Sequence, residues 1–278
     1  AASPSAPRGP DLSRLEDIIT SAGLDENATP AVVVPPVEYP TSRRRDAALA
    51  GVVWPDAIGL TAQPWGAASG KFLSVVLRRT DGPLASRWAQ IGLRNVLLAK
   101  TAAPGQVNPA DWVAERAWLL LKLGEADSAR LLVSSVDTVD FTPKLVQVAG
   151  QVALANSDPS GLCAIESPLA SVEPKIAPLV TAMCASLAGE AERAAADIDQ
   201  VRRRGRLNAI DVALADKVVG AGADTSRAVT IEWEPVNLLT SWRYGLSTAT
   251  AMMPPARLLN DAQPQVRAWL ARAPMFSA

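Results

Sequence analysis

Histidine is absent from all 278 residues of the chain. Its absence removes the usual general base near neutral pH, the base of Ser-His-Asp and Cys-His constellations, and the commonest zinc ligand. An enzyme built on this sequence would have to work through carboxylates, Lys, Tyr or Ser. The chain also carries no phosphate-binding loop, dinucleotide fingerprint, calcium loop or paired-Cys zinc motif. We therefore predict no catalytic residue, no metal site and no cofactor.

Aromatic residues are scarce, at 5% of the chain, whereas 49% of residues are hydrophobic. The hydrophobic residues are mostly Ala, Leu and Val, which suit closely packed helices better than a sandwich or a barrel. A chain of this length and apolar content can bury a sizeable core. The sequence predicts an all-α protein.

An excess of charge is also missing, because 27 basic residues face 28 acidic ones and leave a net charge of −1. Without a long-range field of one sign, we expect no nucleic-acid partner. Apolar runs are short and interrupted by polar residues or Pro, so none reaches the roughly 18 to 20 residues needed to span a bilayer. We expect a chain that does not span a membrane.

Cysteine occurs only twice, at Cys163 and Cys184. Cys163 lies near the start of one predicted helix and Cys184 near the end of the next, and antiparallel neighbouring helices bring those two ends together. This predicts a disulfide, which for a loop of about 20 residues would contribute roughly 3 kcal/mol. The alternative is two unrelated buried thiols that pack as small hydrophobic groups.

The first seven residues, Ala-Ala-Ser-Pro-Ser-Ala-Pro, include no initiator Met and resemble the mature side of a signal-peptidase cut. We expect a periplasmic or otherwise exported protein, and an oxidising compartment agrees with the predicted disulfide. The alternative is a sequence that begins within a longer protein.

Residues 1–60 are predicted to form an N-terminal segment distinct from the helical repeat domain at 61–278. Asp11 is a plausible N-cap for a short amphipathic helix over Leu12–Ala22, which Gly23 ends. Paired prolines after Val32, Val33 and Val34 then favour an extended strap.

From about residue 66 the periodicity becomes helical, and Gly or Pro marks several helix ends. Predicted helices cover 66–80, 84–100, 109–123, 126–137, 142–155, 160–168, 174–188, 190–204 and 208–220. Pro168 and Pro178 are expected to interrupt helices. Residues 230–278 concentrate Trp and Pro, and we expect them either to cap the helical array or to be divergent repeats.

The middle of the chain contains an internal repeat. The turn residues Gly124, Asn156 and Gly189 are separated by 32 and 33 residues. A small residue stands seven positions before each turn residue and another five positions after it: Ala117, Ala149 and Ala182 before, and Ala129, Gly161 and Ala194 after. Small residues on both sides of a turn let two antiparallel helices approach closely.

Over roughly residues 109–220 this pattern resembles tetratricopeptide-like (TPR-like) repeats of an exported bacterial type. The resemblance implies an α-solenoid of antiparallel helical hairpins with a groove for peptides or proteins. Together with export, it implies a non-enzymatic scaffold or assembly factor of the bacterial cell envelope that binds protein partners.

Candidate binding residues lie near the start of the predicted repeat domain. Arg43, Arg44 and Arg45 form a run that could clamp phosphate, carboxylate or an acidic partner, or could be a solvated charge run. Trp54 and Trp65 each adjoin a proline and could form a platform for sugar or peptide, or could fill gaps between helices.

Two alternatives to a scaffold remain open. The first is an enzyme or accessory of cell-wall polysaccharide metabolism, which requires a deep cleft with Glu166 or another acid beside two or more Trp rings. The second is a structural subunit of a larger envelope assembly, which requires a broad exposed apolar face.

Overall fold

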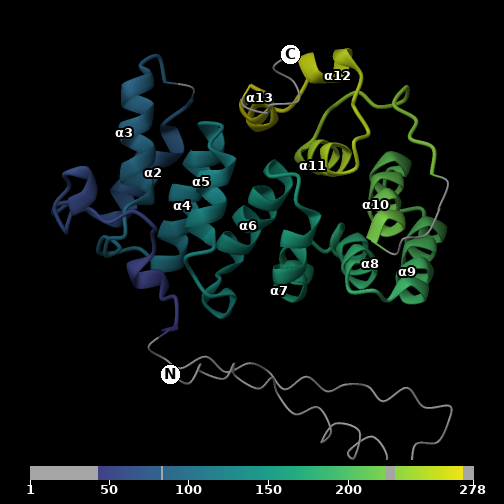
Figure 1. Cartoon of the computed structure of the whole chain (residues 1–278), viewed down its shortest axis with the longest axis horizontal. Helices are drawn as coiled ribbons and strands as arrows, with labels where there is room; N and C mark the ends of the chain where they lie inside the picture. The colour runs from purple at the N-terminus through teal and green to yellow at the C-terminus, as the bar shows by residue number, and fades with distance from the viewer. Residues whose placement is uncertain (1–42, 83, 223–228, 272–278) are drawn as a thin grey trace, which may run out of the picture. The chain divides into compact units, whose positions relative to one another are not determined.

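The computed structural model of the protein describes residues 43–82, 84–222 and 229–271. The predicted helix Leu12–Ala22 and the Pro-rich strap lie outside these ranges. The described residues belong to one compact unit that begins at Arg43. They are helical without any β-strand, and only an isolated parallel bridge joins Val53 to Ala99. The all-α prediction is confirmed (Figure 1).

The helices follow one another with short connections. Their bounds are η2 Ala47–Leu49, η3 Asp56–Ile58, α2 Gly70–Arg79, α3 Arg87–Leu98, α4 Pro109–Lys122, α5 Ala126–Val133, η4 Thr138–Asp140, α6 Pro143–Ala155, η5 Pro159–Ile165, α7 Glu166–Val172, α8 Ala177–Leu187, α9 Ala191–Arg204, α10 Ala209–Gly222, α11 Ser241–Ala249, α12 Ala256–Asn260 and α13 Pro264–Leu270, where η denotes a 3₁₀-helix. In the part of the chain that is described, none of these helices has the length and apolar character of a membrane span.

Local capping explains why most predicted boundaries agree with the structure. The side chains of Ser69, Asn108 and Thr142 accept hydrogen bonds from backbone N–H groups in the first turns of α2, α4 and α6. Pro168 and Pro178 stand in the first turns of α7 and α8, where a missing N–H is tolerated. Both prolines therefore lie at the starts of helices and do not interrupt them. The predicted helix 160–168 is instead two elements, η5 and α7.

The repeated turn is present, with one change of register. Gly124, Ser157 and Gly189 have positive φ angles of 75°, 54° and 86°. At each, the N–H of the next residue bonds the carbonyl five positions back, on Leu120, Ala153 or Ala185. The middle turn is thus centred on Ser157 and not on Asn156, the residue that the sequence spacing selects.

Consecutive helices from α4 to α10 contact one another, and alternate helices also meet, α4 with α6 and α8 with α10. The small residues of the repeat lie in these contacts: Ala117, Ala182, Ala129 and Ala194 are fully buried. Because alanine adds only a methyl group, helix axes can approach closely at these positions.

The C-terminal residues 229–271 return along the array. Helix α11 packs against α6 and α10, and α13 packs against α4 (Figure 1, yellow on teal and green). Arg243 on α11 forms a bidentate ion pair with Asp211 on α10, and the indole N–H of Trp269 donates to the carbonyl of Leu121 at 3.2 Å. The C-terminal segment therefore covers alternate helices of the array.

The predicted disulfide is present. Cys163 in η5 and Cys184 in α8 are bonded, with their Cα atoms 5.5 Å apart. Since η5 and α8 already contact one another, the bond joins two elements that pack directly.

Arg116 on α4 is wholly buried and joins three segments. Its guanidinium donates to the carbonyl oxygens of Leu97 at 2.7 Å, Ala99 at 2.7 Å and Ala50 at 3.1 Å. It also lies 5.8 Å from the centroid of the Trp65 ring. Burial lowers the pKa of Arg116 to about 9, so the group still carries its proton at pH 7.

We expect Arg116→Met to lower the free energy of unfolding by about 3 kcal/mol, because it leaves three buried carbonyls without their donor. Arg116→Lys replaces the planar guanidinium with a single ammonium, so its free energy of unfolding should lie between those of the parent protein and Arg116→Met. Urea denaturation measures both, with Arg130→Gln, which removes only an exposed pair with Asp127, as control. Equal stability of Arg116→Met and the control would contradict the joining role.

A second prediction concerns the docking of α11 on α6. A methyl group at Gly245 would lie 2.7 Å from the carbonyl oxygen of Leu154 and 2.8 Å from its Cα. Gly245→Ala should therefore cost about 1 to 3 kcal/mol. Gly92→Ala, in α3 with nothing within 4 Å of the added methyl, should instead stabilise by up to about 1 kcal/mol. If thermal denaturation showed that Gly245→Ala and Gly92→Ala raise the melting temperature equally, then α11 would not pack closely against α6 at Gly245.

Candidate functional site

A cleft of about 600 Å³ lies where the C-terminal segment passes over α4, α6 and α7. This volume is within the usual range for ligand sites. Its lining combines side chains from the helical array with side chains from the C-terminal segment. They are Arg78, Glu115, Trp118, Lys144, Gln147, Val148, Gln151, Leu154, Leu162, Leu169, Glu173, Ile176, Thr240, Ser241, Trp242, Gln263 and Gln265. We call it the α6 cleft, because α6 supplies residues along its whole length.

One end of the α6 cleft is charged. The carboxylate of Glu115 is almost fully buried, with its side chain 2% exposed, and Arg78 and Lys144 both form ion pairs with it. Hydrogen bonding to Glu115 raises the pKa of Arg78 above its usual value. Two lining cations therefore share one lining carboxylate, while a second acid, Asp111, also acts on Arg78 from outside the lining.

The middle of the α6 cleft is lined by primary amides. Gln147 and Gln151 come from α6, and Gln263 and Gln265 from the segment around α13. Gln265 donates to Gln263 and to the hydroxyl of Ser241, both at 3.3 Å. The Oε1 atom of Gln151 is buried and accepts no hydrogen bond from the described residues. Because this oxygen has essentially no accessible surface, it is not a contact surface for a ligand, whereas the exposed amide of Gln147 is one.

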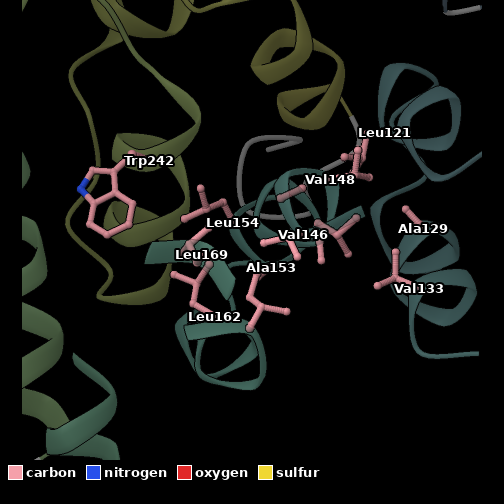
Figure 2. Packing of buried hydrophobic residues seen from close by; sticks show 14 of the residues in the cluster. Leu121, Ala129, Val133, Val146, Val148, Ala153, Leu154, Leu162, Leu169 and Trp242 are labelled. Carbon is pink, nitrogen blue, oxygen red and sulfur yellow. The ribbon is translucent and has the colours of Figure 1, made fainter. Parts of the chain in front are cut away.

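The other end of the α6 cleft is apolar. Figure 2 shows the side chains of Leu154, Leu162 and Leu169 close together, with the ring of Trp242 beside them. The Trp242 indole N–H is already used, donating to the carbonyl of Asp211 at 3.2 Å. Trp242 therefore offers the cleft an apolar surface.

A second hollow of about 1080 Å³ lies between α9, α10 and residues 229–243. Four of its charged groups are paired within the protein, Arg202 with Asp216 and Arg243 with Asp211. The α6 cleft, which combines partly exposed cations with several primary amides and an apolar surface, is the better candidate for a ligand site.

The arginine run is bound to the protein itself. Arg44 pairs with Asp140 at 2.5 Å, and hydrogen bonding to this carboxylate raises the pKa of Arg44. Arg45 donates its backbone N–H and its Nε to Asp137 at 3.0 and 2.8 Å, and it also reaches the carbonyl of Ser134. Arg43 is exposed. Arg44 and Arg45 thus fasten the start of the compact unit to the residues after α5, and neither lines the α6 cleft.

The two tryptophans selected from the sequence also lie outside the α6 cleft. Trp54 is 62% exposed, with the ammonium of Lys100 4.8 Å from its ring centroid. Trp65 is half-buried against Trp112 in an edge-to-face contact with 5.0 Å between centroids, and its N–H donates to Thr101. The structure does not bring the five predicted binding residues into one site. A binding role for them stays a prediction.

Sequence reasoning missed the residues of the α6 cleft, although one signal was there to find. Lys144, Gln147 and Gln151 interrupt an otherwise apolar helix at spacings of three and four, which places them on one face. Within the described ranges, no group of three or more acidic or cysteine side chains could hold a metal ion. No family model, curated protein or solved structure matches the chain.

The pairing of Arg45 with Asp137 yields a pH-dependence. Hydrogen bonds from the backbone and then the side chain of Arg45 hold the pKa of Asp137 below its ordinary value. The resulting stabilisation is complete above the unfolded pKa of about 3.9 and is lost as pH falls through the lower, folded pKa.

We therefore expect Asp137→Asn to lower the urea midpoint at pH 7, and the difference from the parent protein to shrink below about pH 4. Asp127→Asn, which affects only an exposed pair within α5, serves as the matched control. A difference that stays constant down to pH 2.5 would show that the Arg45 contacts do not favour the ionised carboxylate.

Proposed function

We propose that this protein is a non-enzymatic scaffold or assembly factor of the bacterial cell envelope, a TPR-like α-solenoid that holds a segment of a partner protein in the α6 cleft. The observation that carries the proposal is the lining of the cleft, with primary amides between a charged and an apolar end. Primary amides offer both a donor and an acceptor, as a peptide backbone does. The repeated turns and buried alanines support the solenoid reading.

The acids near the cleft favour binding over catalysis. The carboxylate of Glu115 is engaged in ion pairs with two cations of the protein itself. Glu166 accepts a hydrogen bond from Thr181 at 2.7 Å and does not line the cleft. Neither of these two carboxylates is free to act on a ligand in the cleft.

One feature supports the proposed placement in the cell envelope. The disulfide between Cys163 and Cys184 fits an oxidising compartment such as the periplasm.

Polysaccharide binding is the second candidate, because the α6 cleft contains Glu115 together with Trp118 and Trp242. A structural-subunit role is favoured by the apolar side chains of α2, where Phe72 is 62% exposed and Val75 and Val76 are also exposed.

Site-specific photo-crosslinking tests the scaffold proposal. A photoreactive residue is placed at Gln147 in the α6 cleft and, as control, at the exposed Asp127 on α5, and each protein is irradiated in the envelope fraction of its native host. We expect a defined protein adduct from position 147 alone, mapped by mass spectrometry to one segment of the partner. Glycan adducts would favour the polysaccharide candidate, and identical adducts from both positions would remove the cleft from the proposal.

A further inference from the structure

Along α6, the residues that line the cleft change from charged through polar to apolar. Lys144, Gln147, Gln151 and Leu154 all line the cleft. At about 1.5 Å of rise per residue, Lys144 and Leu154 are separated by about 15 Å. An extended chain rises about 3.3 Å per residue, so this distance matches about four to five residues of an extended peptide.

The charges of the α6 cleft select the end at which an anion would bind. Arg78 and Lys144 flank Glu115, and their side chains remain 58% and 33% exposed, so both can contact a further partner. Glu173, at the C-terminal cap of α7, is the other acid of the lining and follows the helix that carries Leu169. A carboxylate is therefore attracted to Arg78 and Lys144 and repelled by Glu173.

The amides favour a ligand that is polar in its middle. Gln147, Gln263 and Gln265 line the cleft, and an aliphatic chain would offer their amide groups no hydrogen bond. A peptide has an N–H and a carbonyl at most residues, so it can both donate to these amides and accept from them. The apolar end, formed by Leu154 and its neighbours, would take an aliphatic side chain.

We infer that the α6 cleft recognises an extended peptide with a carboxylate at the Lys144 end and an aliphatic side chain about four residues away at the Leu154 end. This inference rests on the proposed function and names the chemistry of the segment bound. The carboxylate can come from an acidic side chain or from a free C-terminus.

Fluorescence polarisation with labelled pentapeptides on the full chain tests the inference. The probes are Leu-Ala-Ser-Ala-Asp-amide, its Asn-amide counterpart, Leu-Ala-Ser-Ala-Ala with a free C-terminus, Ser-Ala-Ser-Ala-Asp-amide, and the first two in reversed order. The carboxylate peptides should bind about tenfold more tightly than the Asn-amide peptide, as a charge-assisted hydrogen bond predicts. Comparing the Asp-amide with the free C-terminus identifies the source of the carboxylate.

Variants then assign the preference to the α6 cleft. Lys144→Gln should reduce the tenfold preference to about twofold or less, while Glu115 keeps Arg78 as partner. Arg78→Gln should act in the same direction, and Arg130→Gln, outside the cleft, should change nothing. Circular dichroism and thermal denaturation verify that each variant is folded.

The two proposals fail in different ways. Equal binding of Asp and Asn peptides, or a preference unaltered by both Lys144→Gln and Arg78→Gln, would overturn the peptide chemistry even if crosslinking yields a protein partner. Absence of a cleft-specific protein adduct would count against the scaffold proposal, whatever the synthetic peptides show. If only the forward or only the reversed peptides bind more tightly with Asp than with Asn, that result identifies the direction in which the peptide lies in the cleft.

Discussion

The guanidinium of Arg116 is the group on which packing around α4 depends. Its three carbonyl partners belong to the start of the compact unit and to the end of α3, so one side chain satisfies acceptors from segments that no regular ladder joins. Helix α4 in turn contacts α2, α3, α5, α6 and α13. The position of α4 therefore determines where Glu115, the residue just before Arg116, presents its carboxylate to the α6 cleft. A buried arginine that donates to three carbonyls is specific in direction as well as in place, because its N–H groups point along fixed axes.

The helices were predictable because their boundaries are local. Ser69, Asn108 and Thr142 cap helices with their own side chains, and such residues are recognised from the sequence alone. The register at Asn156 was wrong by one position, because Ser157 takes the positive φ that the spacing assigns to a Gly-like turn residue. Only a backbone shows which of two adjacent polar residues adopts that conformation. The C-terminal return was beyond prediction for a different reason: Trp269 reaches Leu121 over 148 positions, and no local pattern encodes such a contact.

The α6 cleft was less predictable than the fold. Its lining combines residues from α2, α4, α6, α7 and the C-terminal segment, and each residue taken alone is an ordinary polar or apolar side chain. The arginine run and the Trp-Pro pairs were conspicuous in the sequence. In the structure, however, Arg45 forms an ion pair with Asp137, and Trp65 packs edge-to-face against Trp112. Local density of charge or aromatic rings identifies residues able to bind, but it does not show whether the fold has already provided their partners.

The C-terminal segment gives the α6 cleft its dimensions. Without α11 and α13, the alternate helices α4 and α6 would present one open face; with them, Trp242 and the amides around α13 form a second wall. The C-terminal segment thus covers part of the face formed by α4 and α6. The α6 cleft that remains has the length of a few residues of extended chain. A partner that enters so small a space buries little area, so its affinity must come from satisfying groups the protein leaves incomplete. The partly exposed ammonium of Lys144 and the exposed amide of Gln147 are two such groups, and they lie along the same helix.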